Sequence, residues 1–320
     1  MTARILCIGE ALIDMVPRDL FGRTAFLPLA GGAVFNTAIA ARRLGADVAF
    51  CCGLSTDMFG EQLAQALLRD GVDISPCPRS DRPTTLAFVS LTDGQARYSF
   101  FDENTAARMI QPTDLPDIGS DIGAVFLGGI SLVSEPCATT IETFATRAAE
   151  AGRLMMLDPN IRPGFIRDET AYRARLDRLM RKAHVVKLSA EDMVWLLGPV
   201  TPAEGAAALH ALGPRVVLVT EGAEGGSAHL AGGVTKVLPP EVTVADTVGA
   251  GDTFNAGFLA SLADAGLLSP EGIAALTAAT VAQHLEQAVY ASCLSVTRIG
   301  ANPPSREEMS IFRRGLARPA

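Results

Sequence analysis

The residues best suited to chemistry lie in the stretch from Asp246 to Gly257, DTVGAGDTFNAG. A glycine-rich segment precedes an apolar stretch that has the periodicity of a helix. The backbone N–H groups of Gly249, Ala250 and Gly251 are therefore expected at a helix N-terminus. Free amides and the positive end of the helix dipole attract anions such as a phosphoryl group. A carboxylate at Asp252 would repel that anion, unless it serves as the general base for an attacking alcohol. An ordinary helix cap explains this stretch equally well when it is taken alone.

A second group of polar residues is suited to a polyhydroxylated ligand. Asp14 ends an apolar stretch, where a parallel strand would bring a side chain to the ligand edge of a sheet. Gly31 and Gly32 let the backbone approach a ligand closely, and Asn36 offers a donor and an acceptor early in the helix that follows. Arg162, in a loop with two prolines, presents a guanidinium to phosphate or sugar oxygens. Simple turn residues are the structural alternative for Asp14 and for this loop.

The elements that position these residues alternate between strand and helix, which predicts an α/β fold. Apolar runs predict strands over residues 4–9, 47–53, 124–129, 154–157, 185–188 and 216–219. Helical patterns cover residues 31–45, 57–70, 136–151, 171–182, 254–262 and 270–288.

One hairpin interrupts this alternation. Residues 84–91 and 95–101 alternate in polarity around a turn at Thr92-Asp93-Gly94. Such a hairpin is not expected in the main parallel sheet. Together with the segment 16–30, which looks irregular, it predicts a small β lid over the pocket of a single domain spanning residues 1–320. An edge hairpin without a role is the alternative.

Composition excludes several classes of protein. The chain has 320 residues and a net charge of -8, which argues against a nucleic-acid partner. It has no run of 18 apolar residues and no pattern of a signal peptide, so we expect a cytoplasmic protein that does not contact membranes. The six cysteines form no C-x-x-C pair and are expected to be free and buried. The four scattered histidines argue against a zinc site or a Ser-His-Asp triad.

Two of these stretches, at their separation, resemble the ribokinase-like (PfkB) carbohydrate kinases. That family carries Gly-Gly-x-x-x-Asn near its N-terminus and D-T-x-G-A-G-D near its C-terminus, and this chain has Gly31–Asn36 and Asp246–Asp252. The remaining order of elements agrees over essentially the whole chain. The resemblance implies a three-layer α/β fold, with a mostly parallel central sheet flanked by helices and a small β lid.

The resemblance also implies an ATP-dependent sugar kinase that uses Mg²⁺. Asp252 corresponds to the base, and Gly249, Ala250 and Gly251 to the anion hole. The sugar ligands would be Asp14, Gly31, Gly32 and Asn36. The ATP ligands would be Lys187, Ser189, Thr220, Gly222, Gly225 and Gly251. A monovalent cation, K⁺, would lie behind the anion hole, near Asp246, Val248, Ser295, Arg298 and Gly300.

The chain departs from the family at one motif. Ser189-x-x-Asp192 replaces the family's Asn-x-x-Glu, which organises magnesium and phosphate, so metal contact there is expected to run through water.

Within the family, residues 158–163, 186–189 and 300–304 look most like bacterial fructokinases. Kinases of 2-keto-3-deoxygluconate share much of the pattern, and Arg97 or Arg162 would serve the carboxylate of that substrate. A nucleoside kinase would favour an aromatic base pocket, but the chain has one Trp and three Tyr. A catalytically silent sugar-binding protein is a further alternative, against which the intact Gly-Ala-Gly-Asp argues. Lid strands in this family often pair between subunits, which implies a homodimer through the lid.

Overall fold

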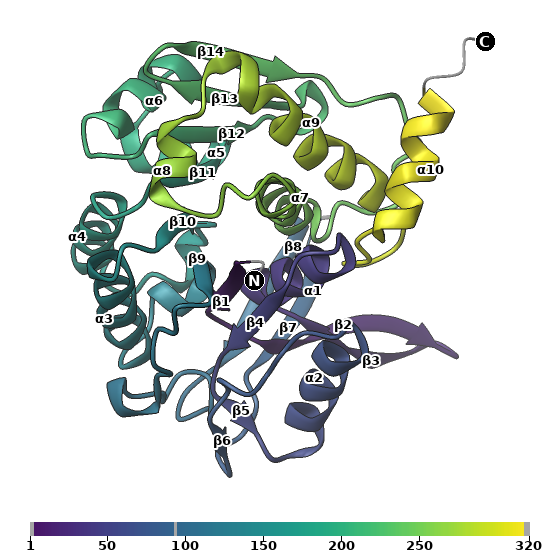
Figure 1. The fold of residues 1–320 in the computed structure, drawn as a ribbon. Coiled ribbons are helices and arrows are strands. Elements are labelled where there is room, and N and C mark those ends of the chain that lie inside the picture. The colour runs from purple at the N-terminus through teal and green to yellow at the C-terminus, as the bar shows by residue number, and fades with distance from the viewer. Residues whose placement is uncertain (1–2, 93–94, 317–320) are drawn as a thin grey trace.

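The computed structural model describes residues 3–92 and 95–316, and within them the side chains of residues 89–98 are not described. Over this part of the chain, the main sheet has the strand order β14-β13-β12-β11-β10-β9-β1-β4 (Figure 1). The strands from β12 to β4 are parallel, whereas β13 and β14 pair antiparallel at one edge. Their bounds are Arg4–Ile8 (β1), Val48–Cys51 (β4), Ile122–Gly128 (β9), Leu154–Asp158 (β10), Val185–Ser189 (β11), Val216–Thr220 (β12), Gly226–Leu230 (β13) and Gly233–Val237 (β14).

Side chains on the central strands alternate between two hydrophobic cores, as the period of a strand requires. In β1, Ile5 and Cys7 belong to one core, and Leu6 and Ile8 belong to the other. The first core also includes residues of α1 (Ala33–Arg43), α2 (Met58–Arg69), α7 (Ala250–Asp264), α8 (Pro270–Ala274), α9 (Ala278–Ser295) and α10 (Arg306–Leu316). The second includes residues of α3 (Cys137–Glu150), α4 (Glu169–Met180), α5 (Ala190–Leu197) and α6 (Pro202–His210). The three-layer α/β fold predicted from the resemblance is confirmed.

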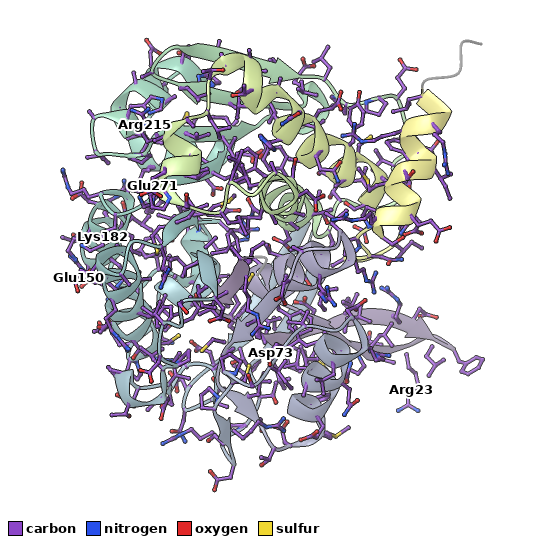
Figure 2. The ribbon with its side chains drawn as sticks, viewed as in Figure 1. Arg23, Asp73, Glu150, Lys182, Arg215 and Glu271 are labelled. Atoms are coloured by element: carbon purple, nitrogen blue, oxygen red, sulfur yellow. The ribbon has the colours of Figure 1, made fainter. Side chains whose placement is uncertain are left out.

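A second sheet is formed by the segments that were predicted to form a lid. It has the order β3-β2-β7-β8, with bounds Arg23–Gly31, Leu12–Leu20, Leu86–Thr92 and Gln95–Phe101. The expectation of irregular structure over residues 16–30 is wrong, because β2 and β3 form a regular hairpin. Their two-residue turn has positive φ at Phe21 (55°) and Gly22 (77°), the conformation that suits the twist of a hairpin. Arg23, just after the turn, lies where the hairpin projects from the body of the molecule (Figure 2).

One other expectation needs correction. The helix predicted over residues 270–288 is two helices, because Thr277 caps a new helix, α9, by accepting a hydrogen bond from the backbone N–H of Thr280. The helix α10 and the hairpin β13–β14 were not predicted. A small parallel pair, β5 (Leu54–Ser55) and β6 (Arg79–Ser80), lies apart from both sheets.

The six cysteines are free and buried, as predicted. Among the described residues, none of the helices has the length and apolar character needed to cross a bilayer.

Candidate active site

The helix α7 begins at the mouth of a large pocket. Gly249 is its N-cap residue and has a left-handed backbone (φ 78°), which glycine adopts without strain. A Cβ at this position would lie 2.8 Å from the Cβ of Ala301, so the residue must also be small. The amides of Ala250 and Gly251 follow in the first helical turn, where backbone N–H groups lack intrahelical acceptors. The pocket has a volume of about 860 Å³ and is lined by this turn.

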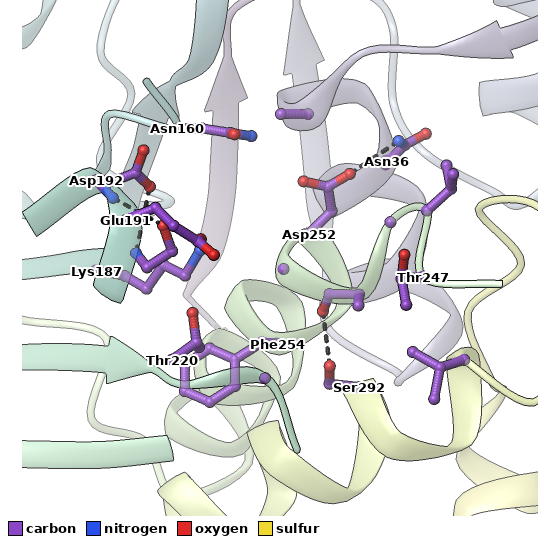
Figure 3. A pocket seen from close by; sticks show the side chains of 18 of the residues that line it. Asn36, Asn160, Lys187, Glu191, Asp192, Thr220, Thr247, Asp252, Phe254 and Ser292 are labelled. Atoms are coloured by element: carbon purple, nitrogen blue, oxygen red, sulfur yellow. Dashed lines mark hydrogen bonds between the residues drawn. The ribbon is translucent and has the colours of Figure 1, made fainter. Parts of the chain in front are cut away.

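Asp252 lies in the first turn of α7 and lines the same pocket. Its side chain accepts a hydrogen bond from Nδ2 of Asn36, on α1, at 2.9 Å (Figure 3). Burial raises the pKa of Asp252 to about 7, while the hydrogen bond from Asn36 acts in the opposite direction. A carboxyl group with that pKa exchanges protons readily near neutral pH, which suits a general base.

The predicted sugar ligands gather on one side of this carboxylate. Asp14, Gly32, Asn36 and Arg162 all line the pocket. Burial raises the pKa of Asp14 to about 6. Gly31 does not line the pocket, but a Cβ there would collide with the carboxylate of Asp14.

The remaining candidate sugar ligand, Arg97, lies in β8, opposite Ser90 of β7. Its side chain is outside the described part of the chain. The carboxylate-binding role considered for Arg97 therefore stays a prediction.

The predicted ATP ligands line the other side of the pocket. Lys187 lies in the middle of β11 and Ser189 at its end. Thr220 ends β12, and Gly222 and Gly225 belong to the turn that follows it. Apolar residues extend this side of the pocket and provide surfaces suited to a nucleobase; they are Pro239, Pro240, Val242, Val244, Val289 and Val296.

Comparison with protein families agrees with this geometry. The model of the "pfkB family carbohydrate kinase" matches residues 2–308. The chain belongs to this family. Among curated proteins, it is 50% identical over 275 residues to a fructokinase of Rhizobium leguminosarum bv. trifolii, covering 85% of this chain and 83% of that one. It is 34% identical over 306 residues to a fructokinase of Klebsiella pneumoniae, covering 94% and 95% of the two chains.

Solved structures of fructokinases share the fold over nearly the whole chain. Xylella fastidiosa fructokinase with bound ATP has a TM-score of 0.89 and 29% identity, covering 99% of this chain and 100% of that one. A double mutant of Vibrio cholerae O395 fructokinase, with fructose, ADP and potassium ion bound, has a TM-score of 0.86 and 25% identity, covering 97% and 98%. The assignment to an ATP-dependent family of carbohydrate kinases therefore rests on sequence and structure together.

The candidate cation ligands of this pfkB kinase are only partly brought together. Asp246 accepts hydrogen bonds from the backbone N–H groups of Val248 (3.1 Å) and Gly300 (2.8 Å), so their two loops lie side by side. In contrast, the hydroxyl of Ser295 donates to the carbonyl of Ser292, and the guanidinium of Arg298 pairs with Glu308. The side chains of Ser295 and Arg298 are thus bound to these other groups and not to Asp246.

The departure at Ser189-x-x-Asp192 has a structural explanation. Ser189 and Asp192 form a capping box at the start of α5. The carboxylate of Asp192 also accepts a hydrogen bond from the backbone N–H of Ile161 at 2.9 Å, so both of its oxygens hold backbone amides. Over the described residues, no cluster of three or more His, Cys, Asp or Glu could hold a metal ion.

Sequence reasoning missed several polar residues of this site. Glu10 is buried, lines the pocket and accepts hydrogen bonds from the backbone N–H groups of Ala33 (2.9 Å) and Ser131 (3.3 Å). Asp158 and Asn255 are buried beside Lys187. The position of Asp158 at the end of a predicted strand was the signal that could have marked it as a site residue. Its pairing with Lys187 could not be predicted, because it depends on which strands are neighbours in the sheet.

Proposed function

We propose that this pfkB kinase transfers the γ-phosphoryl group of ATP to a hydroxyl of fructose. The observation that carries the proposal is the buried Asp252, held by Asn36 in the first turn of α7, beside the N-terminal amides of that helix. Fructose is proposed because the curated relatives at 50% and 34% identity are fructokinases, and one structural neighbour holds fructose and ADP.

In the proposed reaction, Asp252 takes the proton of the sugar hydroxyl as that oxygen attacks the γ-phosphorus. The new bond joins the sugar oxygen to phosphorus, and the bond from phosphorus to the bridging oxygen of ADP breaks. ADP leaves with that oxygen. The backbone N–H groups of Ala250 and Gly251 stabilise the negative charge of the transferring group, because amides at a helix N-terminus are already oriented. Asp14 and Asn36 orient the sugar.

The metal ions have proposed places that follow from the donors present. Mg²⁺ would be held by the ATP phosphates and water, with Glu191 and Asp192 nearby on the pocket wall. It supplies positive charge that compensates the phosphate oxygens. A K⁺ ion would be held by Asp246 and by backbone carbonyls of its loop and of the loop at Gly300, because these two segments adjoin.

We propose that the second sheet is a lid and that two lids pair in a homodimer. Phe100 of β8 lines the pocket, and its ring centroid lies 4.1 Å from that of Phe165 on the body. Large apolar side chains of the lid are exposed, which suits a second copy of the chain. They include Leu20 (54%), Phe21 (93%), Phe26 (42%), Leu27 (45%) and Phe101 (60%).

The test is a coupled ADP-release assay with ATP and Mg²⁺, with and without K⁺. The substrates are fructose, ribose, tagatose, adenosine and 2-keto-3-deoxygluconate. We expect the highest kcat/KM with fructose. A higher kcat/KM with 2-keto-3-deoxygluconate would identify that acid, and not fructose, as the substrate. It would also favour Arg162, which lines the pocket, as the ligand of the carboxylate. Absence of sugar-dependent ADP release across the panel would overturn the kinase proposal.

A further inference from the structure

A buried polar network lies beneath the first turn of α7, and the proposed reaction above does not use it. It joins Lys187 in the middle of β11, Asp158 at the end of β10 and Asn255 on α7. All three residues are nearly inaccessible, at 4%, 3% and 1% exposure. Burying a charged or polar side chain is costly unless partners satisfy it, so such a network in a core calls for a reason.

Strand geometry brings Lys187 and Asp158 together. β10 and β11 are adjacent parallel strands, with Met156 opposite Val185 and Leu157 opposite Val186. Continuing this register by one residue places Asp158 opposite Lys187. Because side chains alternate along a strand, both point to the sheet face that α7 covers. Their Nζ and Oδ2 atoms lie 3.1 Å apart.

Asn255 completes the network from the helix side. Its Nδ2 donates to Oδ2 of Asp158 at 2.6 Å, the same oxygen that receives Lys187. The other amide atom, Oδ1, is buried and has no hydrogen-bond partner among the described residues. The amide therefore makes its one direct hydrogen bond to Asp158 and fixes the orientation of that carboxylate.

The ammonium group of Lys187 lies beside the anion hole. A Cβ added to Gly251 would lie 3.2 Å from Nζ. Outside Gly251, its chain neighbours and the backbone of its own helix, Nζ is the only heavy atom of the described residues within 4 Å of that point. Gly251 is inside α7, where glycine costs roughly 1 kcal/mol relative to alanine. Its missing side chain leaves room for the ammonium group against the helix turn that carries Asp252.

We propose that Asp158 and Asn255 are positioning residues that hold the ammonium group of Lys187 against the first turn of α7, where it stabilises the transferring phosphoryl group. This inference rests on the proposed kinase function and deepens it. Asp158 supplies the counter-charge that a buried ammonium needs, and Asn255 fixes the carboxylate. The lysine then adds a fixed positive charge beside the backbone amides. Charge placed where negative charge develops lowers the barrier to reaction.

A double-mutant cycle tests this proposal. Lys187→Met should lower kcat by about 10²-fold, the cost of losing one such stabilising group. Asp158→Asn should lower kcat at least about tenfold, with the KM for sugar nearly unchanged. In the Lys187→Met background, however, Asp158→Asn should change kcat less than about twofold, because the carboxylate acts through the lysine.

Two further variants probe the same geometry. Asn255→Leu keeps the size of the side chain and removes its hydrogen bond to Asp158, so kcat should fall while the KM for sugar is kept. Gly251→Ala should also lower kcat, since its methyl group would crowd Nζ.

Arg175→Met is the matched control for losing a buried ion pair. Arg175 has a side chain that is 8% exposed and pairs with Glu142 on the far face of the sheet. This variant should lower the melting temperature and leave kcat unchanged.

Each outcome is decisive. Equal losses from Asp158→Asn in both backgrounds, or a lower melting temperature with wild-type kcat, would overturn the positioning role. Wild-type protein without sugar-dependent turnover would instead overturn the proposed function, so the two failures are distinguishable.

Discussion

At the scale of single residues, the environment of Asp252 determines what the site can do. Asp252 is 8% exposed, and its carboxyl group lies near Asp158, Lys187 and Glu10 as well as Asn36. Burial disfavours the charged form, as do the carboxylates of Asp158 and Glu10, whereas the hydrogen bond from Asn36 and the positive charge of Lys187 favour it. The same residue should therefore control the pH dependence of catalysis and part of the pH dependence of stability.

The first prediction concerns catalysis. With ATP saturating, kcat/KM for sugar should fall as the pH drops below about 7, because protonated Asp252 cannot accept the proton of the hydroxyl. The hydrogen bond from Asn36 lowers the pKa of Asp252, so Asn36→Leu should move the midpoint of the profile to higher pH. A pH–rate profile for both proteins is the measurement. An identical midpoint in the variant would assign the profile to ATP or to another group.

The second prediction concerns stability. The pKa of Asp252 is raised in the folded state, so this state binds more protons than the unfolded state between pH 3.8 and about 7. Wild-type stability therefore falls as pH rises through this window. Asp252→Asn removes this loss, which has an upper bound of about 4 kcal/mol at about 1.4 kcal/mol per pKa unit.

The corresponding measurement is thermal unfolding of the wild type and of Asp252→Asn at pH 4.5 and at pH 8. The variant should melt higher at pH 8, with a smaller difference at pH 4.5, while its kcat falls by about 10²–10⁴-fold. A variant that melts lower than the wild type at pH 8 would contradict the conclusion that burying the charged carboxylate of Asp252 destabilises the folded state.

At the scale of elements, α7 joins the two halves of the site. Its N-terminal turn presents the anion hole, its inner face packs on α9, and Asp252 reaches Asn36 on α1. The two ends of this helix both carry glycines with positive φ, Gly249 (78°) and Gly266 (70°). They differ in their surroundings, which allows a matched comparison.

The third prediction compares alanine at these two positions. Gly249→Ala should abolish most turnover, because its methyl group meets Ala301 and the amide next to it must shift. Gly266→Ala has nothing within 4 Å and carries only the backbone strain of a positive φ, on the order of 1 kcal/mol. Its melting temperature should fall while kcat is kept. Similar kcat values for the two variants would show that the conformation of Gly249 is not required for transfer.

The fourth prediction concerns the contact between lid and body. Phe165→Ala removes the ring that packs on Phe100, so the KM for sugar should rise several-fold with a smaller change in kcat. Phe312→Ala is the control, since Phe312 makes an aromatic contact with Tyr290 on the α9–α10 pair. Steady-state kinetics with fructose measures the KM and kcat of both variants. An unchanged KM in Phe165→Ala would argue against closure at this contact.

Sequence patterns predicted the elements with strong local signals. The paired glycines before α1 and the glycine-rich start of α7 marked two helices of the site, and buried apolar runs marked the central parallel strands. The Asp158–Lys187 pair was not predicted, because it depends on β10 and β11 being neighbours. The hairpin β2–β3 was also missed, because its half-exposed strands carry a weak alternation. Long-range pairing is information that local periodicity does not contain.

At the scale of the whole molecule, the hairpin β2–β3 of the proposed lid projects from the three-layer body (Figure 2). The sheet to which it belongs carries exposed apolar residues. Aromatic edge contacts link Phe26 to Phe88 and Phe88 to Phe101 across this sheet. An ordered apolar surface of this kind differs from scattered exposed residues. This contrast motivates a test of the proposed homodimer.

The fifth prediction is that a charge on the lid surface prevents dimerisation. Leu27→Glu should convert the dimer to a monomer, because an unpaired carboxylate in an apolar interface is costly. Val234→Glu, at a 58% exposed position on β14, should leave the mass unchanged. Light scattering coupled to size-exclusion chromatography measures both. A monomeric wild type, or a dimer that survives Leu27→Glu, would contradict the proposal.

The contact of Ala301 with Gly249 has a consequence for how the protein is made. Asn36 and Asp252 are 216 positions apart, and Arg43 reaches Asn302 across 259 positions. During translation, the strands β1 to β12 can leave the ribosome well before Ala301, the residue that contacts Gly249 at the anion hole, has been added to the chain. A nascent chain that stops before residue 301 should therefore contain Asp252 and still fail to phosphorylate sugar. Catalysis is among the last properties that this polypeptide acquires.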